Sequence, residues 1–238
     1  MTFKTSFSIS GRLPAIGRRG RKWLPICLFA IISVAAHAQP ADKAGLNALE
    51  TFVRSTSSGR AAFTQVVTGP AKDGQAGKSK TSSGSFEFLR PNRFSFVYKK
   101  PFEQTIVSDG QTLWLHDVDL NQVTSRKLAQ VMGGTPAAVI ASAANLKALE
   151  ADFTLAALPD KAGVQWVQAT PKSKDGQLQR IAVGLRQTAK GTELVQLEIL
   201  DSFGQNSVMS FTGFEVNPAL GAATFSFQPP AGADVVRQ

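Results

Sequence analysis

The chain has 238 residues, of which 43% are hydrophobic, and a formal net charge of +9. This length and apolar content allow one large domain or two small ones, and they exclude a disordered or collagen-like chain. Subtracting the six Lys and Arg residues of an N-terminal leader from +9 leaves +3, so the charge does not indicate a strongly basic nucleic-acid-binding domain.

The first 38 residues have the pattern of a secretory signal peptide. Residues 1–22 are basic and contain no acid, residues 23–34 are almost wholly apolar, and Ala36-His37-Ala38 offers a cleavage site. An uncleaved anchor is the alternative, but the apolar run is short for a bilayer and Pro25 interrupts it. Arg18-Arg19 also raises a twin-arginine signal, although the apolar residues that usually follow are missing. We predict a signal peptide at 1–38, a single domain at 39–238 and a periplasmic location.

The only cysteine, Cys27, lies in this leader. Lipid attachment at Cys27 would need small residues just before it, and Pro25-Ile26 do not fit that requirement. We therefore expect a mature chain without disulfides, thiol chemistry or a lipid anchor.

The mature chain begins with a predicted amphipathic helix and continues as strands. Apolar residues recur at steps of three and four over 43–55, among them Leu49 and Phe52. Alternating patterns bounded by turn residues then predict a first series of strands, and the stretch 69–83 reads as a long turn. These strands are expected at 61–67, 85–89, 93–98, 104–108, 112–117 and 122–127.

A helical interruption separates this series from a second one. Gly133-Gly134-Thr135-Pro136 predicts the start of a small apolar helix over 137–143, and a further helical turn is expected around 145–150. The second series of strands is expected at 152–158, 164–170, 179–187, 192–200, 206–216 and 224–227. Connections this short exclude parallel crossovers. The prediction is a mainly-β fold, an open and strongly curved antiparallel sheet of eleven or twelve strands with helices in its mouth.

Patterns for catalysis or metal binding are weak. His116 is the only histidine outside the leader, and Asp117 and Asp119 follow it. Neighbouring strand residues point to opposite faces, so an ordinary histidine is favoured over a metal site. No nucleophile elbow, phosphate loop or dinucleotide fingerprint occurs. We expect no enzyme activity, no metal and no other cofactor, and a hydrolase that uses carboxylates distant in the chain is a minor alternative.

The stretch 84–96 predicts a hairpin with aromatic rings on one face. Phe86 and Phe88 share a face before the Arg90-Pro91-Asn92 turn, and Phe94 and Phe96 share a face after it. The rings are consistent with an ordinary core. The alternative is the wall of an apolar cavity, because the predicted helices are too short and too rich in Ala to fill the hollow face.

Arg90, in the turn of this hairpin, allows two interpretations. A hairpin arginine is ordinarily solvated. Beside an aromatic wall it can instead hold the helical pieces through charge-assisted hydrogen bonds to their carbonyls or hydroxyls.

Four segments, in this order, resemble the LolA family of periplasmic outer-membrane lipoprotein carriers: Phe86–Phe96, Ile106–Trp114, Gly134–Pro136 and Phe225–Pro230. The resemblance covers essentially the whole mature chain. It implies an incomplete antiparallel β-barrel of about eleven strands, with a helical lid over a hydrophobic cavity. It also implies a carrier that receives acylated lipoproteins from the inner-membrane transporter LolCDE and passes them to the outer-membrane receptor LolB.

The resemblance further implies roles for individual residues. The arginine that holds the lid corresponds to Arg90, a phenylalanine linked to cavity function and handover corresponds to Phe94, and the second lid helix starts at Pro136. We expect the cavity wall to consist of Phe86, Phe88, Phe94, Phe96 and Leu113. We expect the lid to contribute Leu49, Phe52, Pro136, Val139 and Ile140.

The expected partners follow from the same resemblance. They are acylated lipoproteins as cargo, LolCDE and LolB, with no nucleic acid, and the carrier is expected to be a monomer. The alternative function is a periplasmic protein-interaction or lipid-sensing module that uses the same curved sheet.

Overall fold

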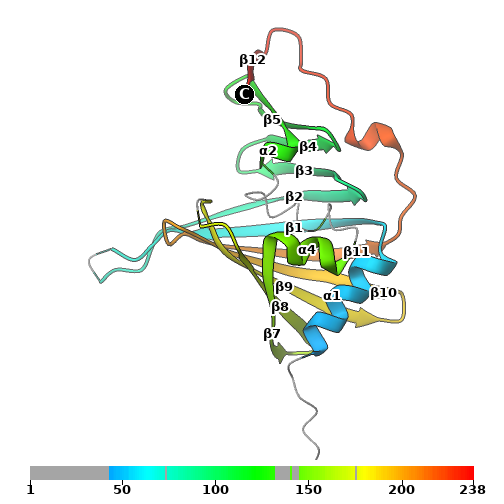
Figure 1. Cartoon of the computed structure of the whole chain (residues 1–238). Helices are drawn as coiled ribbons and strands as arrows, with labels where there is room; N and C mark the ends of the chain where they lie inside the picture. Colours follow the sequence, from blue (N-terminus) through cyan, green and yellow to red (C-terminus); the bar gives the residue numbers. More distant parts are fainter. Residues whose placement is uncertain (1–42, 73, 132–139, 141–144, 175) are drawn as a thin grey trace, which may run out of the picture. The chain divides into compact units, whose positions relative to one another are not determined.

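Twelve strands form one sheet, which is the framework of the chain (Figure 1). The computed structural model describes residues 43–72, 74–131, 140, 145–174 and 176–238. The first six strands are β1 (Ser58–Thr68), β2 (Ser79–Leu89), β3 (Arg93–Lys100), β4 (Gln104–Asp109), β5 (Thr112–Asp117) and β6 (Gln122–Lys127). The last six are β7 (Phe153–Lys161), β8 (Val164–Pro171), β9 (Leu178–Thr188), β10 (Gly191–Asp201), β11 (Asn206–Val216) and β12 (Asp234–Arg237).

The sheet is open. Its strands are hydrogen-bonded in the order β12-β6-β5-β4-β3-β2-β1-β11-β10-β9-β8-β7, and its two edges, β12 and β7, are not neighbours. All neighbouring pairs run antiparallel except β12 with β6. The predicted mainly-β fold, an open antiparallel sheet of this size, is confirmed.

Two local predictions were wrong. The stretch 224–227 is not a strand, because Ala222–Phe225 forms a 3-10 turn, η2, that packs on β3 and β4 with Phe225 buried. The alternation of Phe225 and Phe227 therefore reflects packing onto the sheet rather than pairing within it. The predicted long turn 69–83 is shorter, since β2 already begins at Ser79 and pairs with the end of β1.

The parallel pairing of β12 is possible because the long segment after β11 lets the chain return in that direction.

Helix α1 (Ala44–Ser55) lies on one face of the sheet, here called the inner face. It packs on β7, β8, β9 and β10, and its Phe52 ring also lies 6.1 Å from the Phe88 ring on β2. Strands β2 and β7 are far apart in the strand order. One helix contacts both because the sheet curves around it. The short helix α2 (Leu128–Val131) packs on β6, and α4 (Leu146–Asp152) packs on β7 and α1.

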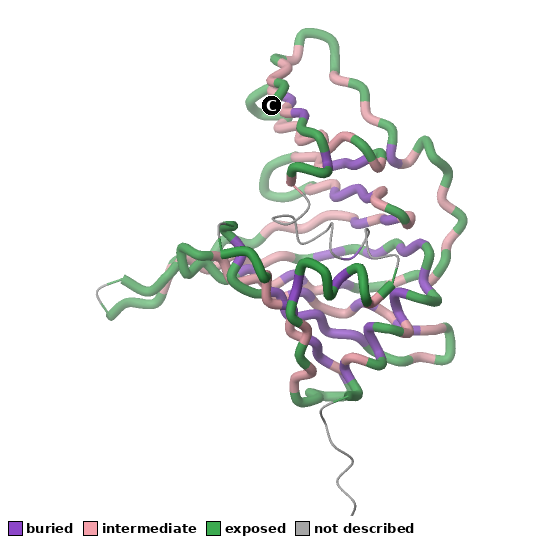
Figure 2. The backbone as a smooth tube through the Cα atoms, in the orientation of Figure 1, coloured by how far each residue is buried: buried purple, intermediate pink, exposed green. Residues whose placement is uncertain are grey.

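The hydrophobic core lies between α1 and the inner face. Figure 2 shows buried segments concentrated where α1 and the neighbouring strands meet, whereas the tip of the β1–β2 hairpin is exposed. The core cluster draws residues from α1, α4 and most of the strands, which is expected when a curved sheet surrounds a helix. Burial of apolar side chains on the inner face therefore holds α1 and the sheet together.

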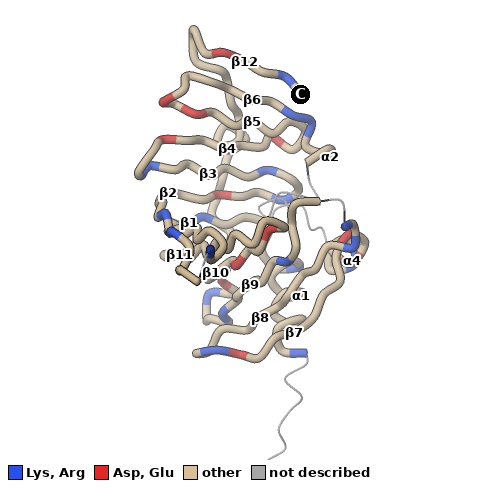
Figure 3. Tube along the Cα trace, turned by 90° about the vertical axis from the view of Figure 1, so that its left-hand side faces the viewer, with Lys and Arg blue, Asp and Glu red and all other residues tan. Residues whose placement is uncertain are grey.

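Charged residues of both signs are intermixed along the strands and turns (Figure 3). None of the helices in the described ranges has the length and hydropathy of a membrane-spanning segment.

Gly45 sets how closely α1 approaches the sheet. It is buried, and a Cβ atom at this position would lie 2.1 Å from the carbonyl oxygen of Trp166 on β8. Since that oxygen belongs to the backbone of a strand that is paired on both sides, with β7 and with β9, it cannot move aside without disturbing β8. A glycine is therefore required for α1 to sit at its observed depth.

We expect Gly45→Ala to lower the free energy of unfolding by about 1–3 kcal/mol, because overpacking outweighs the gain in helix propensity. Urea unfolding of the mature protein measures this change. Gly221→Ala is the matched control, since a Cβ atom there meets nothing within 4 Å. Equal stability of the two variants would show that α1 shifts without cost.

Candidate functional site

Arg90 lies in the tight turn that joins β2 to β3. Asn92 in this turn has a φ of 67°, a left-handed conformation that Asn tolerates better than most residues. The backbone N–H of Arg90 donates a hydrogen bond of 2.8 Å to the carbonyl of Ser57, just after α1. The turn and the end of α1 are therefore fixed to each other, and the Arg90 side chain starts from a defined position.

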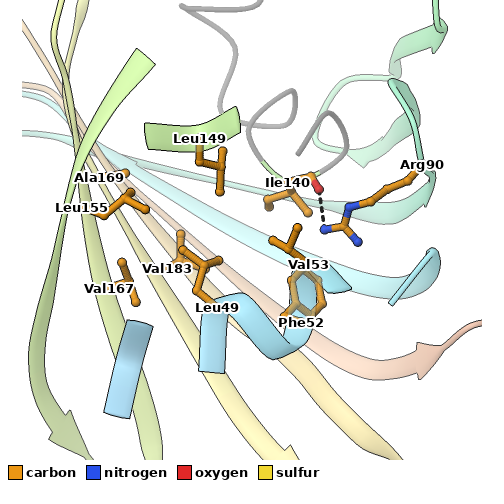
Figure 4. A pocket seen from close by; sticks show the side chains of 10 residues that line it. All are labelled: Leu49, Phe52, Val53, Arg90, Ile140, Leu149, Leu155, Val167, Ala169 and Val183. Carbon is orange, nitrogen blue, oxygen red and sulfur yellow. Dashed lines mark hydrogen bonds between the residues drawn. The ribbon is translucent and has the colours of Figure 1, made fainter. Parts of the chain in front are cut away.

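The Arg90 guanidinium connects two segments on the inner side of the sheet. Its Nη1 donates to the carbonyl of Thr56, at the end of α1. Its Nη2 donates to the carbonyl of Ile140 over 2.7 Å (Figure 4). Both acceptors are backbone carbonyls, so the bridge depends on where the two segments lie rather than on their side chains. This is the kind of contact predicted for Arg90, and its role as a latch stays a prediction.

The guanidinium also lies against aromatic rings. Its central carbon is 5.0 Å from the ring centres of both Phe52 and Phe88. Burial lowers the pKa of Arg90 to about 10, so the group remains charged at neutral pH. Its Nε atom is buried without a hydrogen-bond partner. The charge is thus held by two carbonyls and two rings, with no carboxylate partner among the described residues.

Asn217 holds the Thr56 side of this bridge, and the sequence offered no signal for it. Its Oδ1 accepts hydrogen bonds from the backbone N–H of Ser57 (2.7 Å) and of Ser58 (3.3 Å). Its Nδ2 donates to the carbonyl of Ser55 over 2.9 Å. These bonds satisfy groups at the C-terminus of α1, which otherwise lack partners. Asn217 therefore fixes the peptide that presents the Thr56 carbonyl to Arg90.

An apolar chamber lies behind Arg90, between α1 and strands β7–β9 (Figure 4). Its free volume is about 10 Å³. A cavity of this size holds about one water molecule, so an acyl chain cannot enter without movement of the surrounding segments. The chamber is therefore closed in this structure. Its lining consists of Leu49, Phe52, Val53, Arg90, Ile140, Leu149, Leu155, Val167, Ala169 and Val183.

The four predicted wall phenylalanines are all buried on the inner face. Phe86, Phe88 and Phe94 are fully buried, and Phe96 is 5% exposed. Phe86 and Phe96 stack across the β2–β3 pair with ring centres 4.3 Å apart. Leu113 is partly buried and packs against the same cluster. In the closed state these side chains are core residues, and their contact with acyl chains stays a prediction.

The predicted lid residues divide into two groups. Leu49 and Phe52 project from α1 into the chamber, and Ile140 reaches it from the side opposite to α1 (Figure 4). Pro136 and Val139 lie outside the described residues. The sequence missed the part of the lining that comes from β7, β8 and β9, because Leu155, Val167 and Val183 have the pattern of ordinary strand residues.

His116 lies on the outer face, away from the chamber. Its ring centre is 5.8 Å from that of Phe227, which also packs against Trp114. Within the described ranges, no group of three or more His, Cys, Asp or Glu side chains has the arrangement of a metal site.

The fold and the site together are those of an open antiparallel sheet that curves around a helix, with a small apolar chamber beside one buried arginine. Comparison with known proteins identifies the family. The model of the family described as outer membrane lipoprotein carrier protein LolA matches residues 54–228. The chain belongs to the LolA family.

Named relatives cover nearly the whole chain. An outer-membrane lipoprotein carrier protein from Albidiferax ferrireducens is 66% identical over 210 residues, which are 88% of this chain and 99% of the relative. One from Methylibium petroleiphilum is 53% identical over 221 residues, 93% of this chain and 100% of the relative. Among solved structures, a LolA superfamily protein from Nitrosomonas europaea matches with a TM-score of 0.44 and 13% identity, covering 78% of this chain and 97% of that one.

We expect Arg90→Leu to raise the binding of an apolar fluorescent dye about tenfold or more, because two charge-assisted hydrogen bonds that close the chamber are lost. Arg90→Lys should fall between this variant and the wild type, since one ammonium group cannot reproduce a planar fork. Fluorescence titration of the mature protein measures both.

Arg93→Leu is the control for this experiment. Arg93 lies in the same hairpin, three positions after Arg90, and does not line the chamber. Unchanged dye binding in Arg90→Leu would contradict the view that Arg90 keeps the chamber closed.

Proposed function

We propose that this protein is a periplasmic carrier that shelters the acyl chains of lipoproteins in the chamber behind Arg90. The observation that carries the proposal is an apolar chamber whose lining includes a single cation, bound to backbone carbonyls of two segments. Membership of the LolA family supports it.

The need for shelter follows from the cost of exposing acyl chains to water. Each exposed CH2 group costs about 0.8 kcal/mol, so two or three chains of membrane length cost on the order of tens of kcal/mol. Free diffusion of such a lipoprotein across an aqueous compartment is therefore excluded. A carrier must cover the chains until another apolar site accepts them.

The two hydrogen bonds of Arg90 are much weaker than the free-energy cost of exposing acyl chains to water. Two charge-assisted hydrogen bonds contribute roughly 3–6 kcal/mol in total. This is enough to shift a two-state equilibrium from mostly open to mostly closed. It is far too little to expel acyl chains into water. The bridge therefore favours the empty, closed carrier, and cargo leaves only when a receiving protein covers the chains.

We infer a path from these limits. The signal peptide at 1–38 directs the chain to the periplasm, where the mature carrier takes lipoproteins from the inner-membrane transporter LolCDE. Cargo entry separates Arg90 from the Ile140 carbonyl, and handover to the outer-membrane receptor LolB lets the contact form again. The Phe86, Phe88, Phe94 and Phe96 rings and Leu113 contact the acyl chains in the open state.

Release of lipoproteins from spheroplasts tests this function. Purified mature protein, added to spheroplasts of a Gram-negative bacterium, is expected to move acylated lipoproteins into the soluble fraction as a one-to-one complex. Mass spectrometry of the complex should identify the acyl chains. A protein that releases nothing and carries no acyl chains would instead be an interaction or lipid-sensing module.

The Arg90→Leu variant separates loading from handover. We expect it to accept lipoproteins from spheroplasts and to transfer them to LolB at least tenfold more slowly, because closure no longer competes with cargo. Transfer to liposomes that contain LolB measures the rate, and Arg93→Leu serves as control. Transfer at the wild-type rate would rule out a latch at Arg90.

A further inference from the structure

A continuous series of aromatic contacts runs along the inner face from the Arg90 end of the strands to the opposite end. It begins with the Phe52–Phe88 contact under the guanidinium and continues through β2, β3 and β1. The distances between ring centres are 6.1 Å for Phe52–Phe88, 5.7 Å for Phe88–Phe86, 4.3 Å for Phe86–Phe96, 5.6 Å for Phe96–Phe63 and 5.0 Å for Phe63–Tyr98. We call this series the aromatic row.

The two ends of the aromatic row differ in polarity and exposure. At the first end, Phe52 of α1 and Phe88 of β2 are fully buried and lie against the Arg90 guanidinium. At the second end, the hydroxyl of Tyr98 donates a hydrogen bond of 3.0 Å to Oε1 of Gln65. Nε2 of Gln65 donates in turn to Oγ of Ser207 over 2.7 Å. The row thus passes from a closed end, where a buried guanidinium covers the rings, to a partly exposed end that carries an amide and a hydroxyl.

A hollow of about 460 Å³ adjoins this second end. Tyr98 and Gln65 are among its lining residues, and so are Asp117 and two apolar residues of its rim, Phe102 and Leu120. These two side chains are 68% and 69% exposed, and both line the same hollow. The hollow has the size of a small-molecule site and combines apolar surface with a few polar groups.

The ester and amide groups of the cargo fit the Tyr98 end of the aromatic row rather than the Arg90 end. Ester and amide carbonyls that join acyl chains to a lipoprotein must keep hydrogen-bond donors when water is removed. Around Arg90 the chamber has only about 10 Å³ of free volume, so it has no room for these carbonyls in this structure. At the hollow, one N–H of the Gln65 amide remains for a carbonyl, because an amide carries two. Asp117 accepts a single hydrogen bond, from the N–H of Leu120, so its carboxylate can also accept from a peptide N–H.

We propose that the hollow beside Tyr98 and Gln65 binds the polar, ester- and amide-linked head of the acylated lipoprotein residue. This inference rests on the proposed carrier function and adds a direction to it. The acyl chains lie along the aromatic row toward Arg90, and the peptide leaves past Phe102 and Leu120. Burial raises the pKa of Tyr98 to about 12, so its hydroxyl stays protonated and keeps the Gln65 amide in place.

A pair of probes that differ only at the carbonyls tests the head site. One is a cysteine lipopeptide with two ester-linked chains short enough to stay monomeric, and the other carries ether linkages instead. We expect the mature protein to bind the ester form about fivefold more tightly, the effect of one hydrogen bond. Gln65→Met should remove this preference. Gln168→Met is the control and should retain it, because Gln168 lies on the face of β8 opposite to the chamber residues Val167 and Ala169.

The outcomes of this titration distinguish failure of the head-site proposal from failure of the proposed carrier function. If the wild type binds both probes equally, or if Gln65→Met keeps the preference, the head site is wrong while the carrier function stands. If neither probe binds, both are wrong. Apolar-dye displacement by each probe supplies the dissociation constants.

Photocrosslinking tests the exit path. A photoreactive residue replaces Phe102, and in a control chain it replaces Phe203, which is 67% exposed in the turn between β10 and β11. In the loaded complex, the Phe102 position should crosslink to the residues just after the acylated cysteine at least fivefold more often than the Phe203 position. Equal yields would overturn the proposal, as would crosslinks at position 102 to the transporter or receptor in place of cargo.

Discussion

The buried guanidinium of Arg90 is the interaction that links the end of α1 to Ile140 at the edge of the apolar chamber. It joins the Thr56 carbonyl at the end of α1 to the Ile140 carbonyl and lies over the rings of Phe52 and Phe88. Both acceptors are backbone groups, and no carboxylate among the described residues takes part. The contact is therefore moderate in strength, and its charge does not change near neutral pH. It is therefore suited to be broken by an apolar ligand and formed again.

The rest of the fold supplies the conditions for that contact. Gly45 lets α1 sit deep against β8, and Asn217 fixes the end of the same helix. The open sheet curves around α1, so that β2 and β7 both contribute to one core. The same side chains serve two purposes, because a chamber with about 10 Å³ of free volume is a packed core when empty. Cargo that enters the chamber must therefore replace contacts that the lining side chains make with one another in the closed state.

This arrangement explains how a carrier can work without a nucleotide. The energy scale of acyl burial exceeds that of the Arg90 bridge several times over, so the direction of transfer is set by the receiving site, and the bridge only biases the empty state. The aromatic row gives the inner face an axis, which begins beside Arg90 at the chamber and ends at Tyr98 beside the hollow. A ligand with apolar chains and a polar head has one favourable orientation along it.

Sequence by itself determined eleven of the twelve strands, β1 to β11, together with the hairpin around Arg90 and the family, but it did not predict β12. These follow from alternation of period two, from turn residues such as Pro91 and Asn92, and from motifs along the chain, all of which are local. Only the tertiary structure decided what Arg90 contacts, since Thr56 and Ile140 lie 34 and 50 residues away from it. It also decided that Phe225 packs on the sheet instead of pairing, and that Tyr98 meets Gln65. Such contacts depend on how far the sheet curves and how deep α1 sits, which no periodic pattern in the chain records.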